Sequence, residues 1–221
     1  MLTTLIFDID LTLVNSLDAC AKGTNMIADR FGLERKTREE VLACISLPLG
    51  PYWGRLWGRY DPEWLEYFKS DVEPVIDLNG PLYPGATDLL RHARNKGILL
   101  AVATNRKNPW LDLAKMGIAH LFDTAVGAEE GLKPKPEPDI PLRVIKQLHS
   151  EPVNTIFVGD SRFDMLAAKA AGIRALGLKQ GGTPEKDLLD AGAWRVKSYI
   201  TDVKEILDSS QGFGFQREKL V

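Results

Sequence analysis

The sequence contains little that would stabilise a secreted protein or anchor one in a membrane. It has two cysteines, Cys20 and Cys44, and no Cys/His spacing typical of a zinc site, which indicates reduced thiols in a cytoplasmic chain. No apolar run approaches the roughly 18 residues of a membrane helix. The best run, residues 98–103, has the length of a strand. Asp8 and Asp10 interrupt the N-terminal apolar run, and no basic segment precedes it, so we expect no signal peptide.

The charges are nearly balanced, with 28 Lys and Arg against 30 Asp and Glu and a formal net charge of -2. This balance gives no bulk electrostatic reason to bind nucleic acid or anionic lipid. The hydrophobic fraction of 44% is sufficient for a core and argues against a disordered or fibrous chain. We therefore expect a soluble globular protein, a monomer or homodimer, without a nucleic-acid or membrane partner.

Short apolar runs alternate with helical patterns through most of the chain. The runs are nearly continuous in hydrophobicity, which is typical of strands buried on both faces of a parallel sheet. They span residues 4–7, 98–103, 123–126, 155–158 and 173–176. Apolar residues three and four apart predict helices, most of them followed by a glycine, at 87–96, 109–116, 138–149, 162–171 and 184–191. The repeated order predicts an α/β fold with a doubly wound, Rossmann-like parallel sheet.

One long segment interrupts this order. About seventy residues between the first strand and Gly85 contain no convincing strand, which is too long for an ordinary loop. Helical patterns occupy residues 17–31, 38–46, 51–60 and 62–75. We expect a helical cap domain over residues 15–82, inserted into a catalytic core formed by residues 1–14 and 83–208. The tail, residues 209–221, is expected to fray.

Acidic residues follow two of the predicted strands, at the edge where doubly wound sheets bind ligands. Asp8 and Asp10 follow the first strand, and Asp160 and Asp164 follow the fourth. Thr104 follows the second strand at the same edge. Crowded carboxylates repel one another and raise one another's pKa values unless a cation lies among them. Mg²⁺ suits such a site, because it prefers a few carboxylate oxygens and retains water or phosphate ligands.

A lysine in a stiff loop is a further candidate for the site. Residues 131–140 contain three prolines and two lysines, Lys133 and Lys135. Proline restricts the backbone, so a lysine there is held with little loss of conformational freedom. Such a lysine can screen a nucleophilic carboxylate and bind a phosphoryl oxygen. The pattern alone leaves open which of the two lysines lies in the site.

Four segments with possible chemistry follow one another at the strand ends: Asp8-x-Asp10-x-Thr12-Leu13-Val14, Thr104-Asn105, Lys135-Pro136-x-Pro138-Asp139-Ile140 and Gly159-Asp160-Ser161-x-x-Asp164. Together they resemble the four motifs of the haloacid dehalogenase superfamily, in its subclass with a helical cap after the first motif. Four motifs in this order are far more specific than any one alone. Within the superfamily the chain most resembles phosphoglycolate phosphatases, through Tyr83-Pro84-Gly85, Thr104-Asn105-Arg106 and Ala191-Gly192-Ala193.

The resemblance implies a Mg²⁺-dependent phosphatase that acts on a small phosphorylated metabolite. It implies that Asp8 attacks phosphorus and forms an aspartyl phosphate. Asp10 would serve as general acid and then base, a role that requires an elevated pKa. The other implied roles are phosphate binding by Thr104, Asn105, Lys135 and the cap residue Ser46, Mg²⁺ ligation by Asp8, the carbonyl of Asp10 and Asp160, and support of these ligands by Asp164, Thr12 and Ser161.

Two departures from the family pattern concern the backbone near the site. Leu11 stands where the family more often has glycine, so the backbone there is either in an ordinary region or strained. Lys135 is aligned because the residues through Ile140 then fit, and Lys133 remains the alternative. Two other functions also stay open: a β-phosphoglucomutase-like phosphomutase, which retains the intermediate, and a non-catalytic regulatory or interaction protein on this fold.

Overall fold

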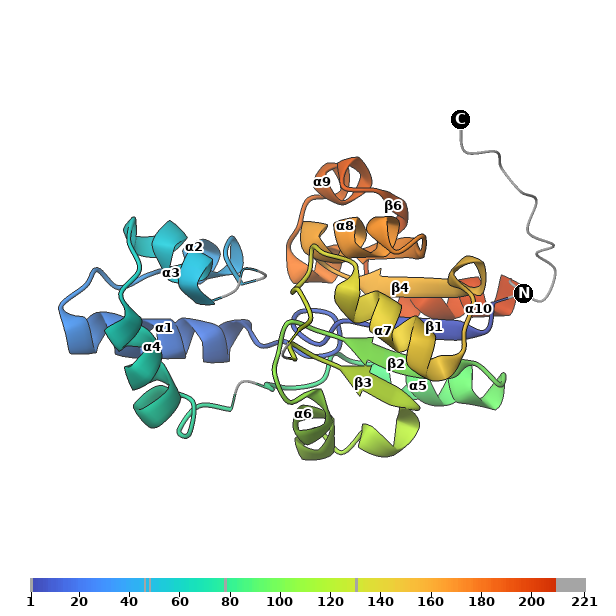
Figure 1. The fold of residues 1–221 in the computed structure, drawn as a ribbon, viewed down its shortest axis with the longest axis horizontal. Coiled ribbons are helices and arrows are strands. Elements are labelled where there is room, and N and C mark those ends of the chain that lie inside the picture. The colour runs from blue at the N-terminus through green and yellow to red at the C-terminus, as the bar shows by residue number, and fades with distance from the viewer. Residues whose placement is uncertain (1, 46, 48, 78, 130, 210–221) are drawn as a thin grey trace.

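A six-stranded parallel sheet forms the centre of the computed structural model, which describes residues 2–45, 47, 49–77, 79–129 and 131–209. The strand order is β3-β2-β1-β4-β5-β6. The strands are β1 (Thr4–Phe7), β2 (Leu99–Ala103), β3 (Thr124–Val126), β4 (Thr155–Gly159), β5 (Arg174–Leu178) and β6 (Ala193–Lys197). Helices cover both faces of the sheet (Figure 1), so the expected doubly wound α/β fold is confirmed.

Apart from the last, the helices against the sheet agree with the expected ones to within a few residues. They are α5 (Ala86–Asn95), α6 (Pro109–Lys115), α7 (Asp139–Leu148), α8 (Arg162–Ala170), α9 (Glu185–Asp190) and α10 (Val203–Ser209). Of the α-helices and strands in the described part of the chain, only α10 and the edge strand β6 have no counterpart among the sequence predictions. Trp194 and Arg195 of β6 are exposed, so this strand lacks the continuous hydrophobic run of a central strand.

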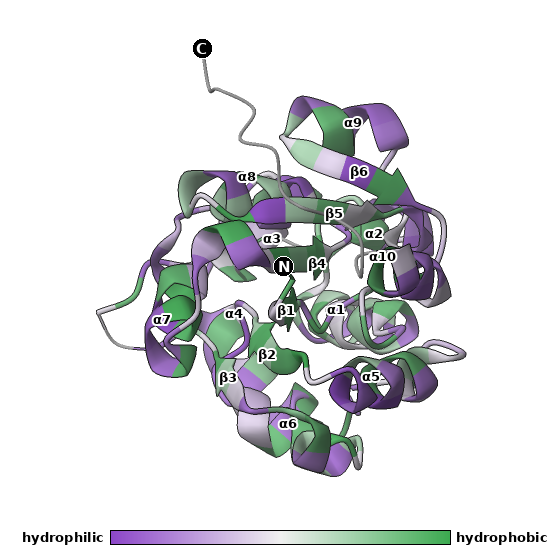
Figure 2. Cartoon of the chain, turned by 90° about the vertical axis from the view of Figure 1, so that its right-hand side faces the viewer, coloured by the Kyte–Doolittle hydropathy of each residue, from purple (hydrophilic) through white to green (hydrophobic). Residues whose placement is uncertain are grey.

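Both faces of the sheet are buried, which explains the continuous apolar runs. All residues of β1 are buried. Leu5 of β1 belongs to the hydrophobic cluster that includes Leu90 of α5, whereas Ile6 belongs to the opposite cluster with Met165 of α8. In Figure 2 the central strand β4 is green, and helix α5 presents purple residues on its outer side. Successive strand residues therefore pack against different helix layers.

Between β1 and α5 the described chain is helical and has a hydrophobic cluster of its own. The helices are α1 (Leu17–Phe31), α2 (Arg38–Leu42), α3 (Leu49–Trp57) and α4 (Pro62–Tyr67), followed by a π-helical turn at Phe68–Val72. Trp53 and Trp64 are the largest fully buried side chains of this cluster, and their rings meet edge to face at 6.4 Å. Figure 1 shows these helices beyond the carboxyl ends of the strands. The domain limits at residues 15 and 82 stay a prediction.

The two chain crossings between these helices and the sheet run side by side. The Asn15 amide donates to the Pro81 carbonyl at 2.9 Å, and the Tyr83 amide donates to the Leu13 carbonyl at 2.9 Å. Gly80 has a φ of 57°, and a Cβ there would lie 2.3 Å from the Asn15 carbonyl oxygen. The pairing therefore requires glycine at position 80. It joins the helical segment directly to the loop that follows β1.

The described helices include none that is long and apolar enough to cross a membrane. Cys20 and Cys44 are free thiols, as expected from their number. Burial raises the pKa of Cys20 to about 12. This thiol therefore stays protonated near neutral pH and is a poor nucleophile.

Replacing a leucine in the centre of the sheet tests this account of the core. Leu100 of β2 is fully buried, so Leu100→Ala is expected to lower the free energy of unfolding by about 2–5 kcal/mol. Leu111 of α6 is 53% exposed, so Leu111→Ala is expected to change the free energy of unfolding by less than about 0.5 kcal/mol. Urea denaturation followed by circular dichroism measures both changes. Equal effects of the two substitutions would contradict the described burial.

Candidate active site

The strand order brings the sequence-predicted acids together. β1 lies at the centre of the sheet between β2 and β4, so the loops that leave these three strands are neighbours. Asp8 follows β1, Thr104 follows β2, and Asp160 follows β4. Ser161 caps helix α8 and accepts a hydrogen bond from the backbone of Asp164, which fixes the first turn of that helix.

Lys135 is the lysine that enters the site. Its side chain is 3% exposed, and its Nζ lies 2.9 Å from Asp8 Oδ1 and 2.6 Å from Asp164 Oδ1. The same ammonium donates to the Ala103 carbonyl at 3.1 Å. Lys133 is exposed to solvent, so of the two lysines it is Lys135 whose ammonium contacts the acids.

Asn105 fixes the backbone of Lys135. The Asn105 Oδ1 accepts from the Lys135 amide at 2.8 Å, and its Nδ2 donates to the Lys135 carbonyl at 3.2 Å. Both ends of the side-chain amide are therefore engaged with the lysine loop. Thr104 is buried, and its hydroxyl accepts from the Arg106 amide at 3.3 Å. Ser46, the expected contact from the helical segment, lies outside the described residues.

Three buried carboxylates form a compact cluster. One oxygen each from Asp8, Asp160 and Asp164 lies within 4.8 Å of the others. Asp164 uses both oxygens inside the protein, because Oδ1 contacts Lys135 and Oδ2 accepts from the amide and hydroxyl of Ser161 at 3.0 and 2.7 Å. Asp160 Oδ1 accepts from the Thr12 hydroxyl at 3.0 Å, whereas no hydrogen bond to its Oδ2 is found among the described residues.

The three carboxylates of this cluster outnumber the one ammonium that contacts them. Burial raises the pKa of Asp8 to about 6, and nearby acids add to that rise while Lys135 opposes it. Burial, together with Asp164 and Asp8, raises the pKa of Asp160 well above its ordinary value. Burial alone would lower the pKa of Lys135, but Asp164 and Asp8 outweigh it and hold this pKa above its usual range. One ammonium among three carboxylates leaves an excess of negative charge, and the oxygen donors suit Mg²⁺.

Asp10 is held by an arginine for which sequence reasoning gave no role. Arg106 Nε donates to Asp10 Oδ2 at 2.9 Å, and Arg106 Nη2 donates to Asp10 Oδ1 at 2.7 Å. Burial pushes the pKa of Asp10 upward, but the Arg106 charge and hydrogen bonds outweigh it, so the net pKa is lowered. The expectation of an elevated pKa is therefore wrong for this conformation. Nothing in the spacing of Asp10 and Arg106 along the chain predicts the contact.

The turn after β1 adopts the conformation that glycine would favour. Leu11 has a φ of 54° and is 2% exposed, so the backbone is in the left-handed region although the residue is leucine. Gln180, in the loop after β5, donates through Nε2 to the Thr12 carbonyl at 2.9 Å and to the Leu11 carbonyl at 3.4 Å. The side-chain oxygen of Gln180, Oε1, accepts a hydrogen bond from the Ile200 amide at 2.8 Å. Gln180 thus braces the strained turn, a role that sequence reasoning missed.

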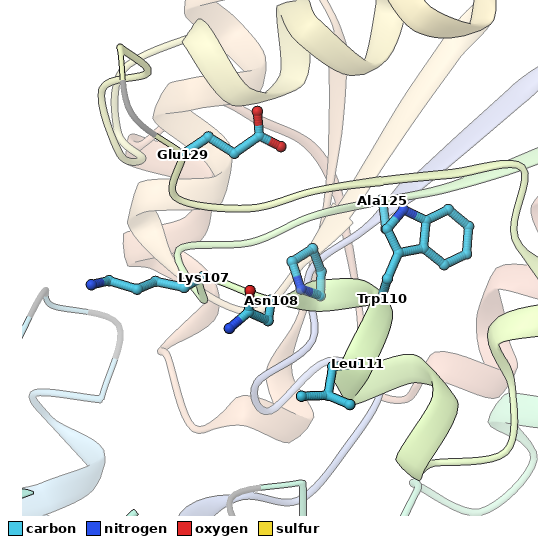
Figure 3. Close-up of a pocket in the computed structure, with 7 residues that line it drawn as sticks. Lys107, Asn108, Trp110, Leu111, Ala125 and Glu129 are labelled. Carbon is cyan, nitrogen blue, oxygen red and sulfur yellow. The ribbon is translucent and has the colours of Figure 1, made fainter. Parts of the chain in front are cut away.

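A shallow pocket of about 600 Å³ lies beside the loop that follows β2. Its lining residues are Lys107, Asn108, Pro109, Trp110, Leu111, Ala125 and Glu129. Figure 3 shows the Trp110 indole beside Ala125, with the Lys107 side chain pointing away from both. None of the carboxylates described above lines this pocket, so it is separate from the acidic cluster.

Comparison with known proteins gives concordant matches. The family model of haloacid dehalogenase-like hydrolases matches residues 5–178. Phosphoglycolate phosphatase 1 of Pseudomonas aeruginosa is 39% identical over 217 residues, which cover 92% of this chain and 79% of the relative. Phosphoglycolate phosphatase of Haemophilus influenzae is 31% identical over 190 residues, which cover 79% and 84%.

Solved structures show the same fold. A haloacid dehalogenase-like family hydrolase from Streptococcus pneumoniae superposes with a TM-score of 0.83 at 20% identity. The superposition covers 93% of this chain and 98% of that one. At this level of identity the likeness concerns the fold alone.

A glycine beside the cluster offers a test of its packing. A Cβ at Gly181 would lie 2.2 Å from Asp160 Oδ2 and 2.4 Å from Asp160 Cβ. Gly181→Ala is therefore expected to displace Asp160 and to lower the free energy of unfolding by about 1–3 kcal/mol. Gly54, inside helix α3, has open space around it, so Gly54→Ala is expected to raise the free energy of unfolding by about 0.5–1 kcal/mol. Urea denaturation measures both changes in the free energy of unfolding. Changes of the same sign for the two substitutions would refute the close approach of Gly181 to Asp160.

Proposed function

Because the chain belongs to the haloacid dehalogenase-like hydrolase family, we propose that it hydrolyses the phosphomonoester of a small metabolite with Mg²⁺ through an aspartyl-phosphate intermediate. The phosphatase class follows from the family and from curated relatives that are phosphatases. One observation carries the finer proposal: the Asp8 carboxylate lies buried at the end of the central strand, 2.9 Å from the Lys135 ammonium. A carboxylate in this setting can attack phosphorus.

Asp8 is the proposed nucleophile. In the first step a carboxylate oxygen of Asp8 forms a bond to phosphorus while the bond from phosphorus to the ester oxygen breaks. Lys135, already in contact with Asp8, reduces repulsion between the carboxylate and the anionic phosphoryl group. Asp164 keeps that ammonium in place, since its Oδ1 lies 2.6 Å from Nζ. Most of the acceleration then comes from positioning and charge stabilisation.

Asp10 is the proposed general acid and base. It lies two residues after Asp8, and its side chain is 27% exposed, so it can reach a group that enters from solvent. As an acid it protonates the departing ester oxygen. As a base it then takes a proton from the water that attacks the aspartyl phosphate. Arg106 donates to both Asp10 oxygens and favours the ionised carboxylate, so Asp10 takes up a proton more readily when part of that contact is released.

The remaining residues would hold the phosphoryl group and the cation. Thr104 and Lys135 are the proposed phosphate ligands. Asp8, the carbonyl of Asp10 and Asp160 would hold Mg²⁺, and Thr12 and Ser161 orient Asp160 and Asp164 through the hydrogen bonds described above. When bound there, Mg²⁺ would supply positive charge that neutralises the oxygens of a phosphoryl group. The excess of buried carboxylate over ammonium supports this assignment.

The substrate proposal is 2-phosphoglycolate or a metabolite like it. The names of the two curated relatives support this choice. The helical segment at residues 15–82 is the proposed cap that selects the leaving group, and Ser46 within it is a proposed substrate contact. Net release of inorganic phosphate separates this function from that of a phosphomutase, which returns the phosphoryl group to its product.

Removing the nucleophile tests the proposed chemistry. Asp8→Asn is expected to lower phosphate release from 2-phosphoglycolate by about 10⁴-fold or more, because the amide cannot form the intermediate. Asp88→Asn is the matched control, because this substitution makes the same change in charge at a residue that is exposed on helix α5. A colorimetric phosphate assay measures both, with circular dichroism as a check on folding. Unchanged release by Asp8→Asn would refute the assignment.

The pH dependence of Mg²⁺ binding tests the cation site. The pKa of Asp8 is raised to about 6 and that of Asp160 is also raised, so both must lose protons to bind Mg²⁺. In chelator, the folded state keeps protons that the unfolded chain releases. Stability from these groups is therefore fully present below about pH 4 and is lost as the pH rises through about 6.

Mg²⁺ offsets that loss, so it is expected to raise Tm more at about pH 8 than at about pH 5. Thermal scans with MgCl₂ or with EDTA measure this difference. Asp160→Asn is expected to abolish the Mg²⁺-dependent part of the Tm shift, because it removes a proposed ligand. Equal Mg²⁺ effects at both pH values, in the native protein and in Asp160→Asn, would contradict the site.

A further inference from the structure

Arg106 connects the loop after β2 to Asp10 and to Asn79. It lies in the loop after β2, two residues beyond Thr104. Its Nε and Nη2 contact the two oxygens of Asp10, and its Nη1 donates to Asn79 Oδ1 at 2.8 Å. Asn79 belongs to the segment through which the chain returns from the helices to the sheet. The guanidinium side chain is 14% exposed, so it is largely enclosed but open to a ligand on one side.

The position of Asp10 places Arg106 next to the leaving group. A general acid works at about 2.6–3.2 Å from the oxygen that it protonates. The Arg106 nitrogens lie 2.7 and 2.9 Å from the same Asp10 oxygens. A substituent one carbon beyond the ester oxygen therefore comes within reach of the guanidinium. That is the position of the carboxylate in 2-phosphoglycolate.

The contact between Asp10 and Arg106 opposes the acid role of Asp10. Each Asp10 oxygen accepts a hydrogen bond from the guanidinium, which favours the ionised carboxylate, whereas a general acid must carry a proton toward the ester oxygen. A donor that loses its partner in an enclosed site is costly unless another acceptor replaces it. Nη1 contacts Asn79 and, at 3.5 Å, Asp112, whereas Nε and Nη2 are the nitrogens that face Asp10.

We infer that Arg106 is a specificity-determining residue that binds a carboxylate next to the ester oxygen of the substrate and thereby frees Asp10 to face the leaving group. This inference rests on the proposed phosphatase function and adds the residue that recognises the substrate. A carboxylate accepts two parallel hydrogen bonds from a guanidinium, as Asp10 does now. A neutral amide of the same shape offers one acceptor oxygen and no negative charge, so it replaces Asp10 less well than a carboxylate does.

A pair of nearly isosteric substrates tests the inference. The two differ in one group: 2-phosphoglycolate carries a carboxylate where 2-phosphoglycolamide carries a neutral amide. The native protein is expected to prefer 2-phosphoglycolate in kcat/KM. Arg106→Gln is expected to reduce that preference by about 10- to 100-fold, the scale of charge-assisted bidentate contacts, mainly through a higher KM for 2-phosphoglycolate. Arg106→Lys, which keeps the charge without the fork, is expected to recover part of the preference.

The control is Lys107→Gln, which removes one positive charge from the adjacent exposed residue and is expected to leave the preference unchanged. Thermal unfolding shows whether each variant is folded, and Arg106→Lys provides the test if Arg106→Gln is not. Equal losses on both substrates would overturn the inference, because they are the result of a purely structural role. Phosphate release from neither substrate by the native protein would overturn the proposed function as well, so the two failures are distinguishable.

Discussion

Three buried carboxylates around one ammonium impose the constraint on which the site depends. Asp8, Asp160 and Asp164 lie within 4.8 Å of one another, with Lys135 in contact with the first and the third. Carboxylates at such distances repel strongly in a buried environment, so each is stabilised by hydrogen-bond donors and by nearby positive charge. The surrounding structure supplies the donors: Asn105 fixes the Lys135 loop, and hydroxyl groups bind the outer acids. The proposed Mg²⁺ would supply further positive charge.

The sheet makes this arrangement possible because its central strand ends at the acids. Both neighbours of β1 contribute a loop to the site, and the paired crossings at Asn15 and Pro81 attach the helical segment to the same edge. Arg106 reaches from the loop after β2 to Asp10 and to Asn79 beside that crossing. A change at Asp10 therefore bears on the junction between the sheet and the helices. In the proposed mechanism, this coupling would link substrate recognition and acid-base chemistry through one guanidinium.

The sequence predicts the fold and the acids of the site because both depend on local patterns. Continuous apolar runs identify the buried strands, and the acids follow directly where those strands end. Contacts that depend on the tertiary fold were not predictable in this way. Gln180 braces Leu11 from a distant loop, and Gly181 gives room to Asp160, yet neither belongs to a periodic pattern. Arg106 likewise meets Asp10 only after folding, which reverses the pKa shift expected for Asp10.

The covalent intermediate is the central claim, and its direct detection is the most decisive measurement. The protein would be mixed with Mg²⁺ and 2-phosphoglycolate, quenched in acid during turnover, digested, and analysed by mass spectrometry. The account predicts one added phosphoryl group on the peptide that contains Asp8, lost on treatment with hydroxylamine as an acyl phosphate would be. Phosphate release during turnover without any phosphorylated Asp8 peptide, or with the phosphoryl group on another residue, would contradict it.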